Sequence, residues 1–308
     1  MEKESKIFVA GHKGLVGSAF VRRLTSEGYT NIVTRTHQEL DLIRQTEVEK
    51  FFEMERPQYV ILVAAKVGGI HANNTCPAQF IYDNLAIQTN VIHSSYLYSV
   101  KKLLFFGSAC NYPRECPQPM KEEYLLSGYP EPTNESYAVA KIAGIKMCEA
   151  YNRQYGTNMI CAIPTNSYGP KDNFDLNNSH VVPALIRKFH EAKINKLPSV
   201  SIWGSGNQRR EFIYVDDIVD ASIFLIQNYD ESQIINMGTG EDVSIKGLSF
   251  LIKKVVGYKG EIIFDTSKLE GVSRKLLDVS RLDNLSWKAK TSLEEGLLKT
   301  YKWYEERN

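Results

Sequence analysis

Three glycines near the N-terminus, Gly11, Gly14 and Gly17, lie three residues apart between a short apolar run and an amphipathic one. Residues 6–10 have the pattern of a buried strand, and residues 15–24 have apolar positions at helical spacing. A strand that turns through glycines into a helix leaves free backbone N–H groups that point to one place, where a dinucleotide pyrophosphate can bind. The pattern therefore predicts a parallel α/β sheet that begins with a dinucleotide-binding turn.

The first half of the chain continues to alternate strand-like and helix-like segments. Strands are expected at residues 32–35, 59–65, 103–107 and 158–164, and helices at residues 15–28, 45–55, 80–100 and 136–155. This alternation predicts an α/β fold, a Rossmann-type doubly wound parallel sheet with a smaller α/β substrate-binding domain. We expect residues 1–165 to form the cofactor domain, a segment near residues 208–240 to return to it, and residues 166–308 to form mainly the substrate domain.

The second half is less regular. The expected elements are strands at 199–203 and 234–237 and helices at 181–193, 216–227, 244–256 and 293–306. Ser244 is a preferred residue type for the N-cap of its helix. No repeat or low-complexity segment separates this half from the first, so the two are expected to pack together around a substrate cleft.

The composition excludes several classes of function. The formal net charge of the 308 residues is +1, without a block of like charges, which argues against a nucleic-acid partner. No apolar run reaches about 18 residues, and the N-terminus lacks the apolar core of a signal peptide, so no membrane association is expected. The five cysteines are scattered without C-x-x-C spacing. A reduced, cytoplasmic protein without a structural metal is the simplest interpretation.

The end of the second predicted strand indicates which dinucleotide binds. NAD-specific folds place an acidic residue there to hold the ribose 2′-hydroxyl. This chain has Arg35 and His37 in that region, and the first acidic residue is Glu39. A cation at this place suits a 2′-phosphate, so the sequence favours NADPH over NADH; the alternative is that Arg35 is a solvated loop residue.

A tyrosine and a lysine one helical turn apart, Tyr137 and Lys141, follow the fourth predicted strand. This spacing places the phenol and the ammonium on one helix face, where the positive charge favours the phenolate. Such a tyrosine can give a proton to a carbonyl oxygen while hydride reaches the carbon. Ser108, at the end of the same strand, can orient that oxygen. A second Tyr-x-x-x-Lys copy begins at Tyr98, but it directly precedes a strand and is expected to be a helix end.

From these residues onward the chain resembles the GDP-L-fucose synthase family of extended short-chain dehydrogenase/reductases. The resemblance covers essentially the whole chain, and its distinctive segments are residues 10–14, 64–70, 73–75, 131–134, 141–146, 203–206 and 274–278. It implies an NADP(H)-dependent enzyme that epimerises C3 and C5 of GDP-4-keto-6-deoxy-D-mannose and then reduces C4. It also implies a homodimer formed through the helices near residues 80–100 and 136–155.

The resemblance assigns roles to individual residues. Cys110 and His180 would be the acid/base pair of epimerisation, because both side chains titrate near neutrality; from the residues alone, Cys110 is equally a small buried side chain and His180 a loop histidine. The residues expected to bind the nucleotide of the substrate are Arg187, Trp203, Arg210 and Lys275. The residues expected to bind the cofactor, besides Arg35 and His37, are Gly11, His12, Lys13, Gly14, Leu15, Val16, Gly17, Ala64, Ala65, Lys141, Pro164, Thr165 and Asn166.

Three residues depart from the usual family pattern near the expected sugar site: Ala109, Asn111 and Ser167. They leave open a related GDP-4-keto sugar, either the 3,6-dideoxy sugar that gives GDP-L-colitose or a heptose; the alternative is neutral variation in packing. A non-catalytic cofactor-binding regulator is a further alternative. The intact Ser108, Tyr137 and Lys141 argue against it.

Overall fold

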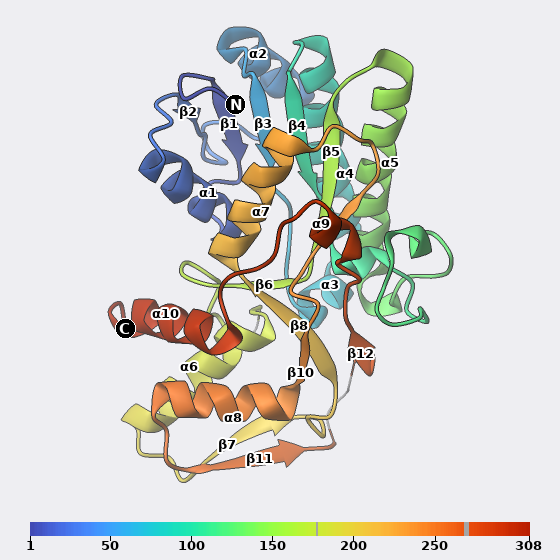
Figure 1. Cartoon of the computed structure of the whole chain (residues 1–308). Helices are drawn as coiled ribbons and strands as arrows, with labels where there is room; N and C mark the ends of the chain where they lie inside the picture. The colour runs from blue at the N-terminus through green and yellow to red at the C-terminus, as the bar shows by residue number, and fades with distance from the viewer. Residues whose placement is uncertain (177, 268–270) are drawn as a thin grey trace.

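The computed structural model describes residues 1–176, 178–267 and 271–308. A six-stranded parallel sheet with the order β2-β1-β3-β4-β5-β9 forms the upper part of the molecule in Figure 1. Its strands are β1 (Ile7–Ala10), β2 (Ile32–Val33), β3 (Tyr59–Leu62), β4 (Lys102–Phe106), β5 (Met159–Pro164) and β9 (Ile235–Met237). The strand order reverses between β1 and β3, and such a point leaves a crevice at the carboxyl ends of the strands. The predicted doubly wound α/β fold is confirmed.

Both faces of this sheet are covered by helices, because successive strand residues point to opposite sides. Ile7 and Val9 belong to one apolar cluster, and Phe8 and Ala10 belong to another. The first cluster includes residues of α1 (Leu15–Ser26) and α7 (Val215–Asn228). The second includes residues of α2 (Gln45–Glu55), α4 (Pro77–Leu97) and α5 (Glu135–Tyr155). All the strands are therefore buried, as continuous apolar runs predict.

The lower part of the molecule in Figure 1 is built from two smaller sheets and the helices α6, α8 and α10. β8 is the centre of a small sheet and pairs with β6, β10 and β12, while β7 pairs with β11. These strands are β6 (Asn166–Tyr168), β7 (Ser199–Trp203), β8 (Arg209–Tyr214), β10 (Asp242–Ser244), β11 (Glu261–Asp265) and β12 (Arg274–Lys275). The helices α6 (Val181–Ile194), α8 (Ile245–Val256) and α10 (Leu293–Glu305) enclose the third apolar cluster with them.

The connections contain the remaining elements, which are α3 (Ile70–Thr75), α9 (Ser280–Asn284) and the single 3₁₀ turns η1 (Ala109–Asn111), η2 (Glu122–Tyr124) and η3 (Pro132–Asn134). Most expected elements agree with the structure to within a few residues. The helix expected at 80–100 begins earlier, at Pro77, after a separate α3. The Ser244 hydroxyl caps α8 by accepting from the Gly247 N–H at 3.0 Å, as predicted.

The sequence did not predict β8, although this strand positions much of the site. The predicted helix at 216–227 corresponds to α7, but no element was predicted for the residues just before it, whose apolar end runs directly into that helix. The chain returns to the large sheet after β8: α7 packs on it and β9 pairs with β5. In sequence, β6, β7 and β8 of the lower part lie between β5 and α7. The exact division into domains stays a prediction. In the described part of the chain, no helix has the length and apolar character to cross a membrane.

Candidate active site

The glycine turn between β1 and α1 leaves no room for a side chain at Gly11 or Gly17. Gly11 has a φ of 92°, in the region that favours glycine. A Cβ at Gly11 would lie 2.8 Å from the backbone nitrogen of Ala64, and a Cβ at Gly17 would lie 2.1 Å from the Gly11 carbonyl oxygen. The turn therefore brings these predicted cofactor residues together. The first turn of α1 has no acidic side chain, so its N–H groups are free of local negative charge.

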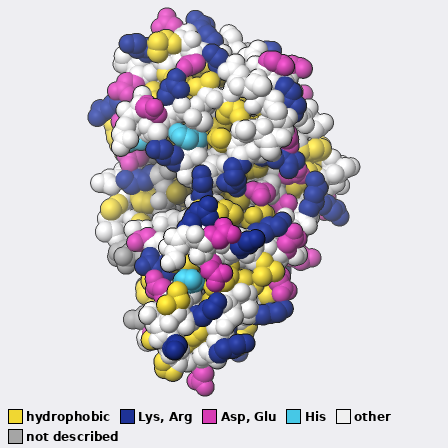
Figure 2. All heavy atoms as spheres, turned by 90° about the vertical axis from the view of Figure 1, so that its left-hand side faces the viewer, with side chains coloured by type: hydrophobic (Ala, Val, Ile, Leu, Met, Phe, Trp, Pro, Cys, Tyr) yellow, Lys and Arg dark blue, Asp and Glu magenta, His cyan; other side chains and the backbone are white. Residues whose placement is uncertain are grey.

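A cavity of about 630 Å³ lies beside this turn. Its walls come from the turn, α1, the loop after β6 and α10, and it is lined by His12, Lys13, Ser18, Val21, Arg22, Lys171, Asp172 and Trp303. Figure 2, which views the molecule from this side, shows lysine and arginine side chains gathered around the waist between the two parts. Burial raises the pKa of Asp172 to about 7, which limits the negative charge beside the turn. The cavity wall is thus predominantly basic.

The two residues predicted to select the 2′-phosphate have different surroundings. The Arg35 guanidinium donates to Glu55 at 2.5 Å and to the Thr34 carbonyl oxygen at 2.8 Å, so its charge is paired. The His37 side chain is 79% exposed and lies 3.6 Å from an Asp41 oxygen. His37 is therefore free to meet a ligand, whereas Arg35 would have to share its charge with Glu55.

Tyr137 and Ser108 meet as the sequence predicted. Tyr137 lies in the first turn of α5, Ser108 follows β4, and their hydroxyl groups are hydrogen-bonded. Burial raises the pKa of Tyr137, the neighbouring Cys110 thiol adds to the rise, and the hydrogen bond to Ser108 opposes it. The phenol is therefore protonated at neutral pH and can act as an acid.

Lys141 lies one turn further along α5. Its side chain is buried, with the ammonium 4.6 Å from the centre of the Phe105 ring. Burial lowers the pKa of Lys141 to about 8. At pH 7 most of the lysine is thus still charged, although burial opposes that charge.

Cys110 lies in η1, which begins directly after Ser108. The Ser108 hydroxyl accepts from the Cys110 N–H at 3.2 Å and so caps this short turn. The Cys110 sulfur interacts electrostatically with Tyr137 and with the Arg210 guanidinium of β8. It also accepts a hydrogen bond from Asn134 at 3.2 Å. The thiol is therefore a member of the Ser108–Tyr137 cluster, and strands from both parts of the molecule contribute to it.

Asn111 is one of the three departures from the family pattern, and it has a structural role. Its side chain is 1% exposed, accepts from the Ser108 N–H at 2.6 Å and donates to the Ala138 carbonyl oxygen at 2.9 Å. It joins η1 to α5 and fixes Ser108 relative to Tyr137. The side chain is buried and directs both its oxygen and its nitrogen to the backbone, so it gives no reason to expect a different sugar.

His180 is at the N-cap position of α6, but its side chain makes no capping hydrogen bond. The side chain is exposed, yet protein atoms surround it closely enough to lower its pKa. These two properties together are those of a residue in the wall of a cleft. The loop before it approaches the connection after β3, since a Cβ at Gly69 would lie 3.4 Å from the Ser179 carbonyl oxygen.

The basic side chains of β8 and β12 point to two opposite faces of the small sheet, because successive strand residues alternate. Arg209 and Arg274 are register partners, and both form ion pairs with Asp242 of β10. Arg210 and Lys275 are the next pair in register, and they lie on the opposite face. Since the Arg210 guanidinium interacts electrostatically with the Cys110 thiol, that face is the one directed to the site. The structure thus separates Arg210 and Lys275 from their neighbours Arg209 and Arg274.

The other two predicted nucleotide residues lie on the outer part of the lower domain. Arg187 of α6 donates to Glu191 at 2.7 Å and to the Phe174 carbonyl oxygen at 3.2 Å. Trp203, at the end of β7, is 66% exposed, and the Lys188 ammonium lies 5.9 Å from its ring centre. They lie on α6 and β7, whereas the Cys110 cluster is formed by residues of η1, α5 and β8, so a ligand bound at both places would extend from one to the other.

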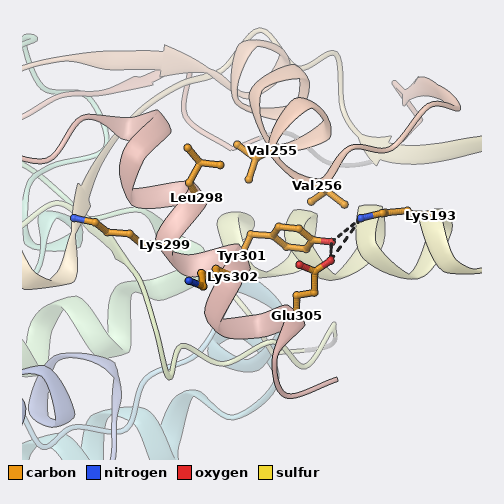
Figure 3. Close-up of a pocket in the computed structure, with 8 residues that line it drawn as sticks. All are labelled: Lys193, Val255, Val256, Leu298, Lys299, Tyr301, Lys302 and Glu305. Carbon is orange, nitrogen blue, oxygen red and sulfur yellow. Dashed lines mark hydrogen bonds and ion pairs between the residues drawn. The ribbon is translucent and has the colours of Figure 1, made fainter.

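A second cavity, of about 460 Å³, lies between α6, α8 and α10. In Figure 3 the Tyr301 side chain points into it, and its hydroxyl accepts from Lys193 at 3.3 Å and donates to Glu305 at 3.0 Å. None of the eight residues lining this cavity is a predicted site residue. It is therefore separate from the candidate active site.

Comparison with known proteins agrees with this geometry. A family model described as "NAD dependent epimerase/dehydratase family" matches residues 7–238. The chain is 58% identical over 306 residues to putative GDP-L-fucose synthase 2 from Arabidopsis thaliana, covering 99% of this chain and 93% of the relative. It is 52% identical over 312 residues to GDP-L-fucose synthase from Escherichia coli (strain K12), covering 98% and 97%. The chain belongs to the GDP-L-fucose synthase family.

Solved structures show the same fold in relatives of this GDP-L-fucose synthase family member. One is a GDP-mannoheptose C4 reductase from Campylobacter jejuni with NADP bound, which is 46% identical to this chain and has a TM-score of 0.93. The match covers 99% of each chain. The similarity covers both the six-stranded sheet and the smaller β8 sheet.

Sequence reasoning missed one residue that holds the site of this family member together. Glu211 of β8 is fully buried, and its carboxylate accepts from the N–H groups of Thr239, Gly240 and Leu277 at 2.6, 2.8 and 3.0 Å. Its backbone carbonyl accepts from the Asn166 side chain at 2.8 Å. Glu211 thus joins β8, the strand that carries Arg210, to β6, to the loop after β9 and to the segment after β12. An acidic residue directly before an apolar strand segment was the available signal.

Proposed function

We propose that this protein is a GDP-L-fucose synthase, which epimerises GDP-4-keto-6-deoxy-D-mannose at C3 and C5 and then reduces C4 with NADPH. The observation that carries the proposal is the cluster in which the Tyr137 hydroxyl, the Ser108 hydroxyl and the Cys110 sulfur lie together. A proton donor for reduction and a thiol for epimerisation can then act on the same sugar ring. The 52–58% identity to GDP-L-fucose synthases over nearly the whole chain favours this substrate over the colitose precursor or a heptose.

NADP(H) fits the turn between β1 and α1. The close approach of Gly11 to Ala64 and the unshielded N–H groups of α1 leave room for a pyrophosphate and attract its charge. Lys13 and His37 are the nearby basic side chains for the 2′-phosphate, and Thr165 and Asn166 are expected beside the nicotinamide. When bound, NADPH supplies the hydride that reaches C4.

In the reduction step, Tyr137 gives its proton to the C4 oxygen. The Ser108 hydroxyl is hydrogen-bonded to the Tyr137 hydroxyl. It can therefore hold the C4 oxygen of the sugar next to the phenol. The charge of Lys141, one helical turn away, stabilises the phenolate that remains. This division of work requires Tyr137 to be protonated before the reaction, which its raised pKa ensures.

In the epimerisation steps, the C4 ketone acidifies the hydrogens on C3 and C5. One of the pair Cys110 and His180 removes such a proton and leaves an enolate, and the other gives a proton to the opposite face. The Arg210 guanidinium interacts electrostatically with the Cys110 thiol and so brings a positive charge to this acid/base pair. The lowered pKa of His180 leaves its imidazole neutral at pH 7, ready to accept a proton.

The nucleotide of the substrate is assigned to the β8–β12 face and to α6. Arg210 and Lys275 are adjacent there, so their positive charges can bind a diphosphate. Arg187 and Trp203 extend the surface along α6 and β7. The open Trp203 ring offers a stacking surface for guanine.

The deciding experiment gives the protein GDP-4-keto-6-deoxy-D-mannose and NADPH in deuterated water and follows the product by NMR. GDP-L-fucose with deuterium at both C3 and C5 is the expected product. Tyr137→Phe should stop NADPH oxidation while deuterium still enters the unreduced ketone. Reduction without deuterium incorporation would reject the epimerase roles of Cys110 and His180.

We also propose a cytoplasmic homodimer with the predicted domain division. All five cysteines are free, as expected of a reducing compartment. The outer surfaces of α4 and α5 expose Tyr82, Leu97 and Tyr155, which are 62%, 47% and 46% accessible. Such apolar surface is suited to self-association. Light scattering after gel filtration should give twice the 35.0 kDa chain mass; a monomer would refute the dimer.

A further inference from the structure

Asn134 has a side chain that is not used in the way its position suggests. It is the last residue of η3 and the N-cap of α5, where asparagine normally accepts a hydrogen bond from the first helical turn. Its side chain makes no such capping bond. Instead, the Asn134 Nδ2 donates to the Cys110 Sγ at 3.2 Å. Helix α5 therefore lacks a side-chain N-cap, and the Asn134 amide is hydrogen-bonded to the Cys110 thiol instead.

The other polar atom of this amide is unsatisfied. The Oδ1 of Asn134 is buried and has no hydrogen-bond partner among the described residues. Leaving a buried carbonyl unpaired is unfavourable. Because nothing else holds Oδ1, no hydrogen bond opposes rotation of the amide by half a turn. After such a rotation Oδ1 can accept from the thiol S–H, just as Nδ2 can donate to the thiolate.

Charged and titratable groups face the sulfur from two other elements. Tyr137 of α5 is hydrogen-bonded to Ser108, and Arg210 of β8 supplies a positive charge. Both interact with the Cys110 thiol electrostatically rather than as neutral hydrogen-bond donors. Asn134 supplies such a donor. Its hydrogen bond orients the sulfur, in addition to the electrostatic attraction from Arg210.

We propose that Asn134 is a positioning residue for proton transfer at Cys110. Its N–H stabilises the thiolate and holds Sγ toward the sugar carbon. When Sγ takes the carbon-bound proton, the electron pair of the broken C–H bond moves to the ketone oxygen as an enolate. The amide then turns and accepts from the new S–H bond. This inference rests on the proposed function for the sugar step, whereas the Asn134–thiol interaction exists in the free protein.

The first test measures the thiol in the free, full-length protein. Iodoacetamide alkylation of Cys110 is followed by mass spectrometry across pH 6–10, since only the thiolate reacts readily. Asn134→Leu removes the donor and should lower the rate at pH 7 about tenfold, the effect of one hydrogen bond to a charged group. Asn134→Asp places a carboxylate beside the sulfur and should lower the rate further. If both variants keep the parent pH profile, the inference is wrong.

A matched control separates this effect from general damage. Asn158 also has a buried, unpaired Oδ1, and its Nδ2 donates to Asp230 at 2.7 Å, on the side of β5 where the strand begins. Asn158→Leu should leave the alkylation profile of Cys110 unchanged. A profile that moves as much as in Asn134→Leu would assign the effect to lost packing instead.

The second test uses the sugar. In Asn134→Leu, deuterium wash-in at C3 and C5 should fall about tenfold, while NADPH affinity, measured by fluorescence, stays within twofold of the parent. An equal loss of exchange and NADPH affinity would indicate a structural role and overturn the inference. If the parent itself exchanges no deuterium but the alkylation profiles differ as expected, the proposed function fails and the Asn134–Cys110 interaction stands.

Discussion

We expect the buried positive charge of Lys141 to lower the free energy of unfolding of the protein without ligands. In the unfolded chain its ammonium has the ordinary pKa of 10.5, and in the folded protein burial lowers the pKa to about 8. The 3% exposed side chain has no hydrogen bond or ion pair at its ammonium among those found for the described residues. Folding at neutral pH therefore has to desolvate a charge without a hydrogen-bonding partner.

The cost follows from the two pKa values. Below pH 8 it amounts to about 3 kcal/mol, since each pKa unit corresponds to about 1.4 kcal/mol. Between pH 8 and 10.5 the unfolded chain binds more protons than the folded one, so stability rises with pH and the cost disappears. Lys141→Met keeps a side chain of similar size without the charge. At pH 7 it should raise the unfolding free energy by about 3 kcal/mol and the melting temperature by about 5 °C.

The assay is thermal unfolding of parent and variant at pH 7 and at pH 10, with NADPH oxidation measured on the same samples. The gain should be large at pH 7 and small at pH 10, and the variant should be inactive as a reductase. Lys102→Met is the control, because this buried ammonium donates to Asp230 at 2.7 Å and to the Ile226 carbonyl oxygen at 2.9 Å. That variant should lose about 2 kcal/mol. A Lys141→Met protein that melts lower at pH 7, or gains equally at both pH values, would refute the reasoning.

Three other features give direct tests. A Cβ at Gly17 would lie 2.1 Å from a backbone oxygen, so Gly17→Ala should weaken NADPH binding at least about tenfold in fluorescence titrations; Gly14→Ala, with its nearest contact at 3.6 Å, should not. Arg210→Leu should weaken GDP binding about 30-fold by calorimetry, while equal loss in Arg209→Leu would contradict the assignment of faces. Glu211→Gln turns one of the carboxylate oxygens that accept three backbone N–H groups into a donor; denaturation should show a loss of about 3 kcal/mol, and an unchanged stability would count against this role.

Features that depend on neighbours in sequence were predictable. The glycine turn follows from the three-residue spacing, and the position of Tyr137 and Lys141 on one helix face follows from the helical period. The apolar runs predicted the strands of the large sheet, because strands buried on both faces need no alternation. The weaker second half was harder, since β8 passes without a break into α7 and has a charged N-terminal end.

The family resemblance singled out Arg210 and Lys275, but the residues alone did not distinguish them from their neighbours. Arg209 and Arg210 look equivalent in sequence, and so do Arg274 and Lys275 as cations. Only the pairing of β8 with β10 and β12 places Asp242 on one face, where it neutralises Arg209 and Arg274. Arg210 and Lys275 remain for a ligand.

The sequence by itself determined the dinucleotide turn, the class of fold and the spacing of the reductase pair, because each depends on residues within one or two turns of chain. The tertiary structure decided what surrounds Cys110. Its sulfur meets Asn134 from 24 residues away and Arg210 from the other part of the molecule. The sequence alone left Asn111 as a candidate sugar contact. In the structure its buried side chain connects Ser108 and η1 to α5 through hydrogen bonds. Such contacts arise from how distant segments pack, and no local pattern encodes them.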